Sequence, residues 1–242
     1  MSDFEMKNPV DGTTEEQRSR RAFLQMSVGG AVAGMLGVAA TEIATPPRAA
    51  AQSTLTPDEA LKELMDGNAR FAANQMTSFQ HDLEMLKSKT VDKQEPFASV
   101  LACADSRVPV EILFDQTIGH IFVARVAGNV VTPEIIGSLE YSAAVLDTKV
   151  ILVLGHRSCG AVKAAIQGKG VPGQISSLFP HMQAAVDAAG PDTDATTKAN
   201  AKYQARLLRE SSTVISEMAK DGKIKVVGAY YDLGSGTVTL LE

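Results

Sequence analysis

Two cysteines, a histidine and an aspartate–arginine pair occur in two short segments that could bind a metal. The chain contains only two cysteines. Cys103 opens the segment Cys103-Ala-Asp105-Ser-Arg107, and Cys159 closes the segment His156-Arg-Ser-Cys159. Two thiolates and one imidazole supply three of the four ligands of a tetrahedral zinc site. The cysteines lie 56 positions apart, so a site that uses both must be assembled by the fold, unlike a local zinc finger.

Each of these segments follows an apolar run that predicts a buried strand. The runs are Phe-Ala-Ser-Val-Leu-Ala at 97–102 and Val-Ile-Leu-Val-Leu at 150–154, as expected for strands covered on both faces of a parallel sheet. The carboxyl ends of neighbouring parallel strands meet in one crevice. We therefore expect Cys103, His156 and Cys159 to converge at this edge of the sheet.

The rest of the chain alternates predicted strands with predicted helices. Further strands are expected at 121–125, 224–231 and 237–241, the last two joined by a glycine-rich turn. Helices are expected at 132–145, 160–166, 175–188 and 197–220, with a loop at 190–194. This alternation predicts a single α/β domain in which helices flank a central, mostly parallel β-sheet with an antiparallel edge hairpin.

Two helices are predicted before the first strand. Thr56-Pro57-Asp58-Glu59 combines an N-cap, a proline at the first helical position and a glutamate three residues after the cap. A second, short helix is expected at 82–87. Neither helix has an obvious partner within the domain, so we expect the N-terminal helices to pack on a partner subunit.

The overall charge excludes one class of partner. The formal net charge is −5 and the isoelectric point is near 5.5, and no basic stripe with interleaved aromatic residues is present. Binding the phosphates of nucleic acid requires clustered lysine and arginine side chains. We therefore expect a small-molecule substrate and no nucleic acid.

Residues 1–51 have the features of an export signal. Arg20-Arg21 precedes a glycine-rich apolar run at 26–40, and a helix-breaking stretch ends in small residues at Ala51. The run is shorter than the roughly twenty residues of a membrane span. The pattern resembles a cleaved twin-arginine signal; the alternative is an uncleaved amphipathic or anchoring helix. Cleavage would leave residues 52–242 as the mature domain, without a stable membrane anchor, in the periplasm or in a thylakoid lumen.

The two metal-binding segments together resemble the β-class carbonic anhydrases. The similarity is strongest from Gln94 to Val162 and includes the Cys-x-Asp-x-Arg motif and the later His-x-x-Cys motif. The resemblance implies one zinc ion per subunit, bound by Cys103, His156 and Cys159. It also implies that zinc-bound hydroxide attacks CO2 to give bicarbonate, in a homodimer or a higher homo-oligomer.

The resemblance gives Asp105 and Arg107 a catalytic role. Asp105 either occupies the fourth position on zinc, which closes the site, or pairs with Arg107, which opens that position to water. Gln94, Phe122 and Tyr141 match the family's substrate-pocket positions, which are contributed across a subunit interface. Gly160 opens a predicted helix, where its N–H could reach a bound ion or a cysteine sulfur.

Two features of the sequence differ from the usual pattern of the family. Arg157 stands where serine or threonine is common, and its charge would either stabilise an anion at the metal or depress activity. The chain has no tryptophan, so it lacks one element of the regulatory site of the bicarbonate-inhibited subtype.

Two other functions are compatible with these residues. The nearest is hydrolysis of carbon disulfide or carbonyl sulfide on the same fold. The other is non-catalytic binding of zinc or bicarbonate, with Asp105 fixed on the metal.

Overall fold

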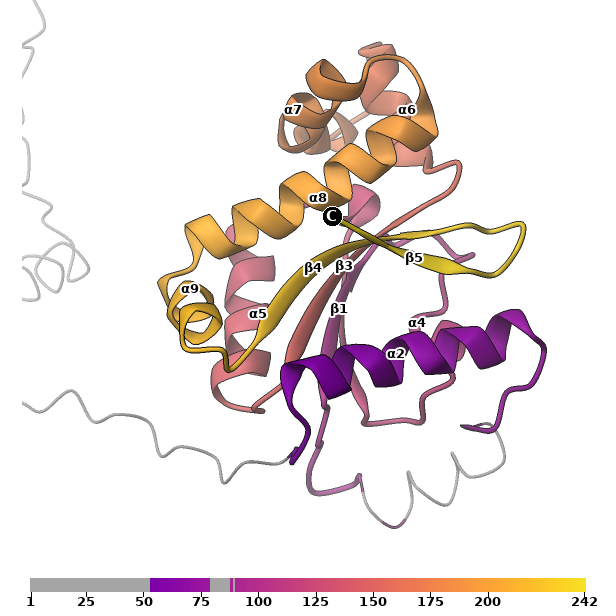
Figure 1. The fold of residues 1–242 in the computed structure, drawn as a ribbon. Helices are drawn as coiled ribbons and strands as arrows, with labels where there is room; N and C mark the ends of the chain where they lie inside the picture. Colours follow the sequence, from indigo (N-terminus) through magenta and orange to yellow (C-terminus); the bar gives the residue numbers. More distant parts are fainter. Residues whose placement is uncertain (1–52, 79–87, 89) are drawn as a thin grey trace, which may run out of the picture. The chain divides into compact units, whose positions relative to one another are not determined.

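The computed structural model describes residues 53–78, 88 and 90–242 of the 242-residue chain. The export signal predicted at 1–51 and the short helix predicted at 82–87 lie outside these residues. The described part contains a five-stranded sheet with the order β2-β1-β3-β4-β5. The predicted α/β architecture with a mostly parallel sheet is therefore confirmed (Figure 1).

Four parallel strands and one antiparallel strand form the sheet. Their bounds are β1 (Ala98–Ala102), β2 (Ile121–Arg125), β3 (Val150–His156), β4 (Lys225–Tyr231) and β5 (Val238–Leu241). β1 and β3 are buried at every position, which explains why their sequences are mostly apolar and show no alternation of polar residues. The polar exception inside β1, Ser99, has its hydroxyl bonded to Ser142 and Thr148. β5 runs antiparallel to β4 and forms the predicted edge hairpin.

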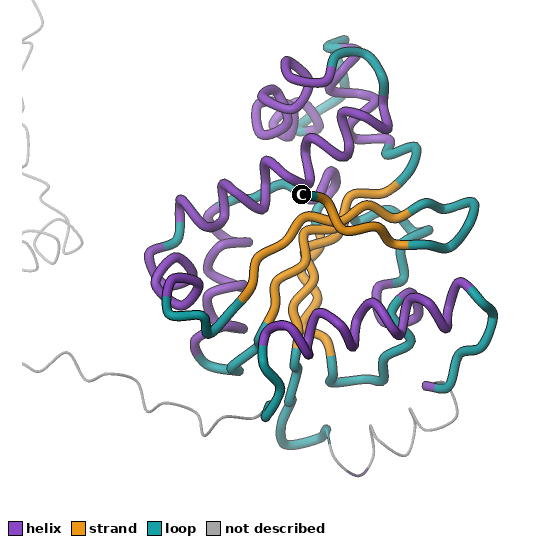
Figure 2. Tube along the Cα trace, in the orientation of Figure 1, coloured by secondary structure: helices purple, strands orange, loops and turns teal. Residues whose placement is uncertain are grey.

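Helices cover both faces of the sheet (Figure 2). They are α2 (Pro57–Ala72), α4 (Val110–Leu113), α5 (Pro133–Ala144), α6 (Gly160–Gln167), α7 (Phe179–Ala189), α8 (Thr193–Ser211) and α9 (Thr213–Lys220). Two 3-10 turns lie at Ala127–Asn129 and Ile175–Leu178. Within the described ranges, no helix has the length and apolar character that crossing a bilayer requires.

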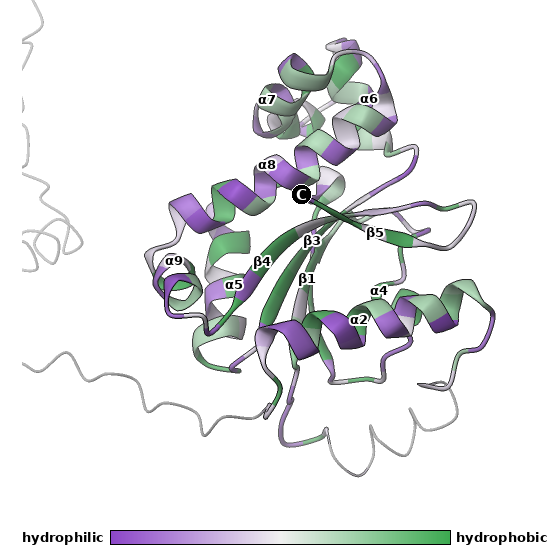
Figure 3. Cartoon of the chain, in the orientation of Figure 1, coloured by the Kyte–Doolittle hydropathy of each residue, from purple (hydrophilic) through white to green (hydrophobic). Residues whose placement is uncertain are grey.

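The core is divided into three buried clusters. Residues of α2 and α4 pack with Val100 and Leu152 on one face of the sheet. Residues of α5, α8 and α9 pack with Leu101 and Ile151 on the other face. A third cluster surrounds both cysteines with apolar residues of α6 and α7. Figure 3 shows the corresponding concentration of hydrophobic residues along β1, β3 and β4.

The structure corrects the expectation that the first helix lacks a partner within its own chain. Ala60 and Leu64 of α2 are fully buried against the sheet. Asn68 donates to the Gly236 carbonyl at 3.0 Å, and its Oδ1 accepts from the Val238 N–H at 2.7 Å. α4, the crossover helix on this face, is only one turn long, which leaves room for α2. Packing on a partner subunit stays a prediction.

The predicted start of α2 is confirmed by both bonds of a capping box. The Thr56 side chain accepts from the Glu59 N–H, and the Glu59 side chain accepts from the Thr56 N–H. Each bond satisfies a backbone donor that the first helical turn leaves unpaired.

The predicted helix at 197–220 is in fact two helices with an earlier start. α8 begins at Thr193, because the Asp192 carboxylate caps it by accepting an N–H at 2.7 Å. The predicted loop at 190–194 is correspondingly shorter. Ser212 has an extended backbone and caps α9 in the same way. Serine favours a helix start because its hydroxyl accepts a free backbone N–H. The continuous helical pattern of 197–220 hides this capping signal.

Candidate metal centre

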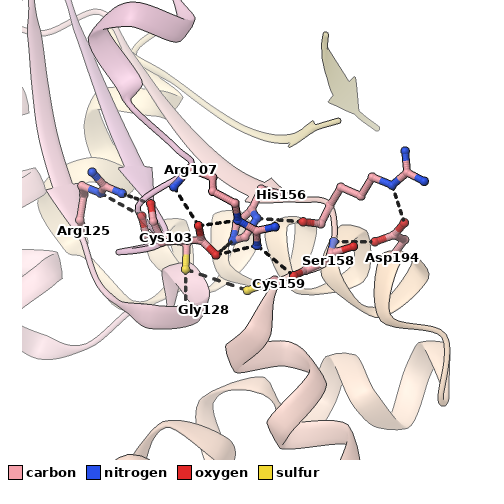
Figure 4. Close-up of polar contacts among 10 residues, drawn as sticks. Cys103, Arg107, Arg125, Gly128, His156, Ser158, Cys159 and Asp194 are labelled. Carbon is pink, nitrogen blue, oxygen red and sulfur yellow. Dashed lines mark hydrogen bonds and ion pairs between the residues drawn. The ribbon is translucent and has the colours of Figure 1, made fainter. Parts of the chain in front are cut away.

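The carboxyl ends of two adjacent strands bring the predicted metal ligands together. β1 ends at Ala102, directly before Cys103, and β3 ends at His156. Because the parallel register pairs Ala102 with Leu154, both side chains lie at the same edge of the sheet. Cys159 immediately precedes the first residue of α6. Figure 4 shows the sulfur atoms of Cys103 and Cys159 facing each other beside His156.

The geometry of these three residues fits a zinc ion. Their ligand atoms lie within 4.8 Å of one another, and all three residues are buried. The two Sγ atoms are 4.0 Å apart, close to the separation of about 3.8 Å expected for two thiolates at about 2.3 Å from one tetrahedral ion. A disulfide would need an S–S distance of about 2.05 Å, so the two sulfurs are not bonded to each other, and their spacing fits two ligands of one metal ion.

The histidine is oriented as a metal ligand. His156 Nδ1 lies 3.0 Å from the Arg157 carbonyl, which makes Nδ1 the donor and leaves the Nε2 lone pair free. Nε2 is buried and has no hydrogen-bond partner among the described residues. A buried polar atom without a partner is costly, and coordination to a metal would satisfy it.

The two thiols shift each other's pKa in opposite directions. A hydrogen bond from Cys159 lowers the pKa of Cys103 against the opposing effect of burial, and contacts with His156 and the Gly128 N–H add to the lowering. The pKa of Cys159 is raised by its hydrogen bond to Cys103, by burial and by the negative charge of Cys103. A divalent cation would stabilise both thiolates, since metal ligation requires deprotonated cysteine.

Asp105 lies beside the three ligands and is held by Arg107. Arg107 Nε donates to Asp105 Oδ1 at 2.9 Å and Nη2 donates to Oδ2 at 2.8 Å, a bidentate pair. Oδ2 is 3.8 Å from His156 Nε2. The Arg107 hydrogen bonds keep the pKa of Asp105 far below its usual range, although partial burial opposes them. The structure therefore shows Asp105 paired with Arg107, the one of the two arrangements that the resemblance associates with an open fourth position.

The last residue of β2, Arg125, and Gly128 just beyond the strand support the Cys103 loop, and no motif in the sequence points to either. Arg125 donates from Nε to the Cys103 carbonyl at 2.9 Å and from Nη2 to the Asp105 carbonyl at 2.6 Å. The Gly128 N–H donates to Cys103 Sγ at 3.3 Å. Gly128 has a φ of 77°, and an added Cβ would lie 2.8 Å from Met182 Sδ. An Arg-x-x-Gly spacing at the end of a strand is too common to identify these contacts.

The Arg157 side chain is paired with acidic residues. Its Nη1 lies 3.4 Å from Asp232 Oδ1, and its Nε lies 3.9 Å from Asp194 Oδ2. The Arg157 backbone N–H donates to the Tyr231 carbonyl at 2.8 Å. These two carboxylates compensate part of the positive charge, and its effect on an anion at the metal or on activity stays a prediction.

The fold of one chain does not bring three predicted pocket residues to the metal ligands. Gln94 is exposed before the amino end of β1, whereas Cys103 follows the carboxyl end. Five strand residues place about 16 Å between these ends. Phe122 pairs with Ser99 near the amino end of β1, and its ring lies 6.4 Å from that of Tyr141. Tyr141 is 46% exposed.

Gly160 is placed as predicted, at the first position of α6 directly after Cys159. The backbone N–H that reaches the Cys103 sulfur belongs to Gly128. A contact between the Gly160 N–H and a bound anion stays a prediction.

Comparison with known proteins gives consistent results. A family model described as carbonic anhydrase matches residues 98–238. A carbonic anhydrase of Mycolicibacterium smegmatis is 38% identical over 76% of this chain and 93% of its own length. Carbonic anhydrase 2 of Mycobacterium tuberculosis is 34% identical over 77% of this chain and 93% of its own length.

Solved structures show the same fold. A β-carbonic anhydrase of Aspergillus fumigatus has a TM-score of 0.61 at 24% identity, over 75% of this chain and 90% of that one. The Coccomyxa β-carbonic anhydrase in complex with acetazolamide has a TM-score of 0.58 at 27% identity, over 75% and 86%. A β-carbonic anhydrase of Sordaria macrospora described as tetrameric has a TM-score of 0.60 at 21% identity, over 76% and 97%.

Proposed function

This chain belongs to the β-class carbonic anhydrase family and catalyses the reversible hydration of CO2, and we propose that one zinc ion per subunit serves the reaction. The observation that carries this proposal is the buried convergence of Cys103, His156 and Cys159, in which His156 Nε2 has no hydrogen-bond partner in the part of the chain that the structure describes. The donor set of two sulfurs and one nitrogen is one that zinc prefers.

The reaction needs a nucleophile at neutral pH and a group that orients it. When bound, zinc acts as a Lewis acid that lowers the pKa of a coordinated water. Asp105 supplies the orientation: Oδ2 lies beside the ligand set, and Arg107 keeps the carboxylate ionised and directed. It can accept a hydrogen bond from the attacking water, which turns the oxygen lone pair toward CO2. Each hydration gives one bicarbonate and releases one proton to buffer.

We propose that the working enzyme is a homo-oligomer in which a second copy completes the substrate pocket. Gln94, Phe122 and Tyr141 lie away from their own metal ligands, and Tyr141 is exposed. Phe122 lies on β2, an edge strand of the sheet, so a partner could pack there and receive these side chains. The Sordaria macrospora relative, described as tetrameric, supports assembly in general.

We also propose that the chain is exported through its twin-arginine-type signal, to the periplasm or a thylakoid lumen. The support is the sequence pattern around Arg20-Arg21. Twin-arginine export moves folded proteins, so zinc could be bound before the thiols meet an oxidising compartment. Replacing both arginines with lysine should retain the protein in the cytoplasm. Export of that variant, or an exported wild type with a Cys103–Cys159 disulfide and no zinc, would contradict the proposal.

The function is tested by combining metal analysis with stopped-flow CO2 hydration from neutral to alkaline pH. Wild type should contain one zinc per chain and hydrate CO2. Cys159→Ala should lose zinc, whereas Asp105→Ala should keep zinc and lose most of the activity. The Asp105→Ala variant is the matched control, because it changes a residue beside the ligands without removing a ligand.

Three outcomes would contradict the proposal. Full zinc content in Cys159→Ala would refute the ligand assignment. Stoichiometric zinc without hydration at any pH would favour a non-catalytic binding protein. Faster release of sulfide from carbonyl sulfide or carbon disulfide than hydration of CO2 would favour the hydrolase.

A further inference from the structure

The turn that carries two of the ligands has an unfavourable backbone conformation. Ser158, between His156 and Cys159, has a φ of 55°, in the left-handed region that residues other than glycine rarely adopt. The directions of the His156 and Cys159 side chains depend on this conformation, because Ser158 lies within the turn that separates them. Such a conformation persists only where surrounding contacts fix it.

Two side chains fix the Ser158 backbone from opposite sides. The Ser158 N–H donates to Asp194 Oδ1 at 3.0 Å. The Ser158 carbonyl accepts from Arg107 Nη2 at 3.3 Å. Both contacts are drawn in Figure 4, where Asp194 reaches the turn from one side and Arg107 from the other. The peptide groups before and after Ser158 are therefore both held by residues distant in the sequence.

Asp194 is free for this contact because its own helix is capped by another residue. Asp194 lies in the first turn of α8, and Asp192 accepts the N–H of Ala195 at 2.7 Å as the N-cap. The second carboxylate oxygen of Asp194 lies 3.9 Å from Arg157 Nε. One carboxylate thus contacts both residues that separate His156 from Cys159.

We infer that Asp194 is a positioning residue for the metal ligands. Its carboxylate holds Ser158 in the left-handed conformation that directs His156 and Cys159 at one ion. Arg107 holds the other side of Ser158 and also binds Asp105, so the ligand turn and the Asp105 carboxylate share one support. This inference rests on the proposed zinc site and adds a residue that the metal-binding motifs do not contain.

The test compares Asp194→Ala with Asp192→Ala in the full-length zinc-loaded chain. Both variants remove a carboxylate from the start of α8, but only the first removes the contact to Ser158. The measurements are the rate of zinc transfer to a chromophoric chelator, the absorption spectrum of the cobalt(II)-substituted protein and the melting temperature. Loss of a residue that orients a metal ligand typically weakens binding 10- to 100-fold, so Asp194→Ala should release zinc at least about tenfold faster than wild type.

A rescue variant separates positioning from general stabilisation. Glycine adopts a φ of 55° without strain, so Ser158→Gly added to Asp194→Ala should restore most of the zinc retention and the wild-type cobalt spectrum. Asp192→Ala should lower the melting temperature while releasing zinc at the wild-type rate. Asp194→Asn keeps an acceptor oxygen for Ser158 and should lie closer to wild type than Asp194→Ala.

The failures of the two proposals are distinguishable. If wild type binds zinc and Asp194→Ala releases it no faster than wild type or Asp192→Ala, the inference is wrong and the proposed function stands. Failure of Ser158→Gly to restore zinc retention would likewise overturn the positioning role. A wild type that binds no zinc would overturn both.

Discussion

Replacement of Gly128 by alanine should damage both the stability of the domain and its metal site. Gly128 has a φ of 77°, which costs an L-residue roughly 1–2 kcal/mol. The new Cβ would lie 2.8 Å from the sulfur of the fully buried Met182, and overpacking of a core typically costs about 1–3 kcal/mol. Some movement of the flexible Met182 side chain would absorb part of this strain. We expect a total loss of about 2–4 kcal/mol in the free energy of unfolding.

This prediction has a matched control and a second readout. Gly168 also has a positive φ of 58°, but an added Cβ would meet nothing within 4 Å. Gly168→Ala should therefore show the backbone cost alone. For a domain of this size, Gly128→Ala should lower the melting temperature by about 5–15 °C, measured by calorimetry. Gly128→Ala should also release zinc faster, because the clash with Met182 would displace the backbone N–H that donates to Cys103 Sγ. Equal melting temperatures for the two variants would refute the packing argument.

Three further predictions concern the catalytic pair, a helix cap and a buried carboxylate. Arg107→Lys should lose most CO2 hydration per bound zinc, because lysine cannot form the bidentate pair with Asp105; full activity per zinc in a stopped-flow assay would contradict this. Ser212→Ala should cost about 1 kcal/mol in chemical denaturation through loss of the α9 cap, and an unchanged midpoint would refute the cap. The side chain of Asp115 is buried, and bonds from Arg70 and from the backbone lower its pKa although burial opposes them, so its stabilisation is present above pH of about 4 and is lost below it. The melting-temperature difference between wild type and Asp115→Asn should consequently shrink as the pH falls below 4, and a constant difference would contradict the assignment.

Much of the site could be predicted because its signals are local. The apolar run before Cys103 and the longer run before His156 each indicate a buried strand, and parallel pairing then brings the two ends together. That argument requires only that β1 and β3 be neighbours, which they are. Asp105 and Arg107 lie two residues apart, so their pairing in a turn also follows from local geometry.

The contacts that support the site could not be predicted, because they join distant parts of the chain. Asp194 reaches Ser158 across 36 positions, and Gly128 reaches Cys103 across 25. Neither residue type is unusual in its local sequence, so only the packing of α8 and of the segment after β2 reveals the contact. The packing of α2 on its own sheet could not be predicted for the same reason. The sequence shows the apolar face of this helix, but not the face of the sheet against which it packs.

The break at Ser212 shows a different limitation. The hydrophobic pattern with a period of 3.6 residues continues through residues 197–220. The Ser212 cap and its extended backbone nevertheless divide this segment into α8 and α9. A single capping residue can outweigh a weak periodic pattern, because it satisfies a backbone N–H that the next helix would leave unpaired. Local capping signals should therefore be weighed inside long helical predictions as well as at their ends.

The central claim is that two cysteines and one histidine bind a zinc ion. Zinc K-edge X-ray absorption of the full-length zinc-loaded protein measures this coordination directly. The claim predicts two sulfur ligands at about 2.3 Å and two nitrogen or oxygen ligands at about 2.0–2.2 Å, with one sulfur lost in Cys159→Ala if that variant holds zinc at all. A coordination shell with one sulfur, or with none, in the wild type would contradict it.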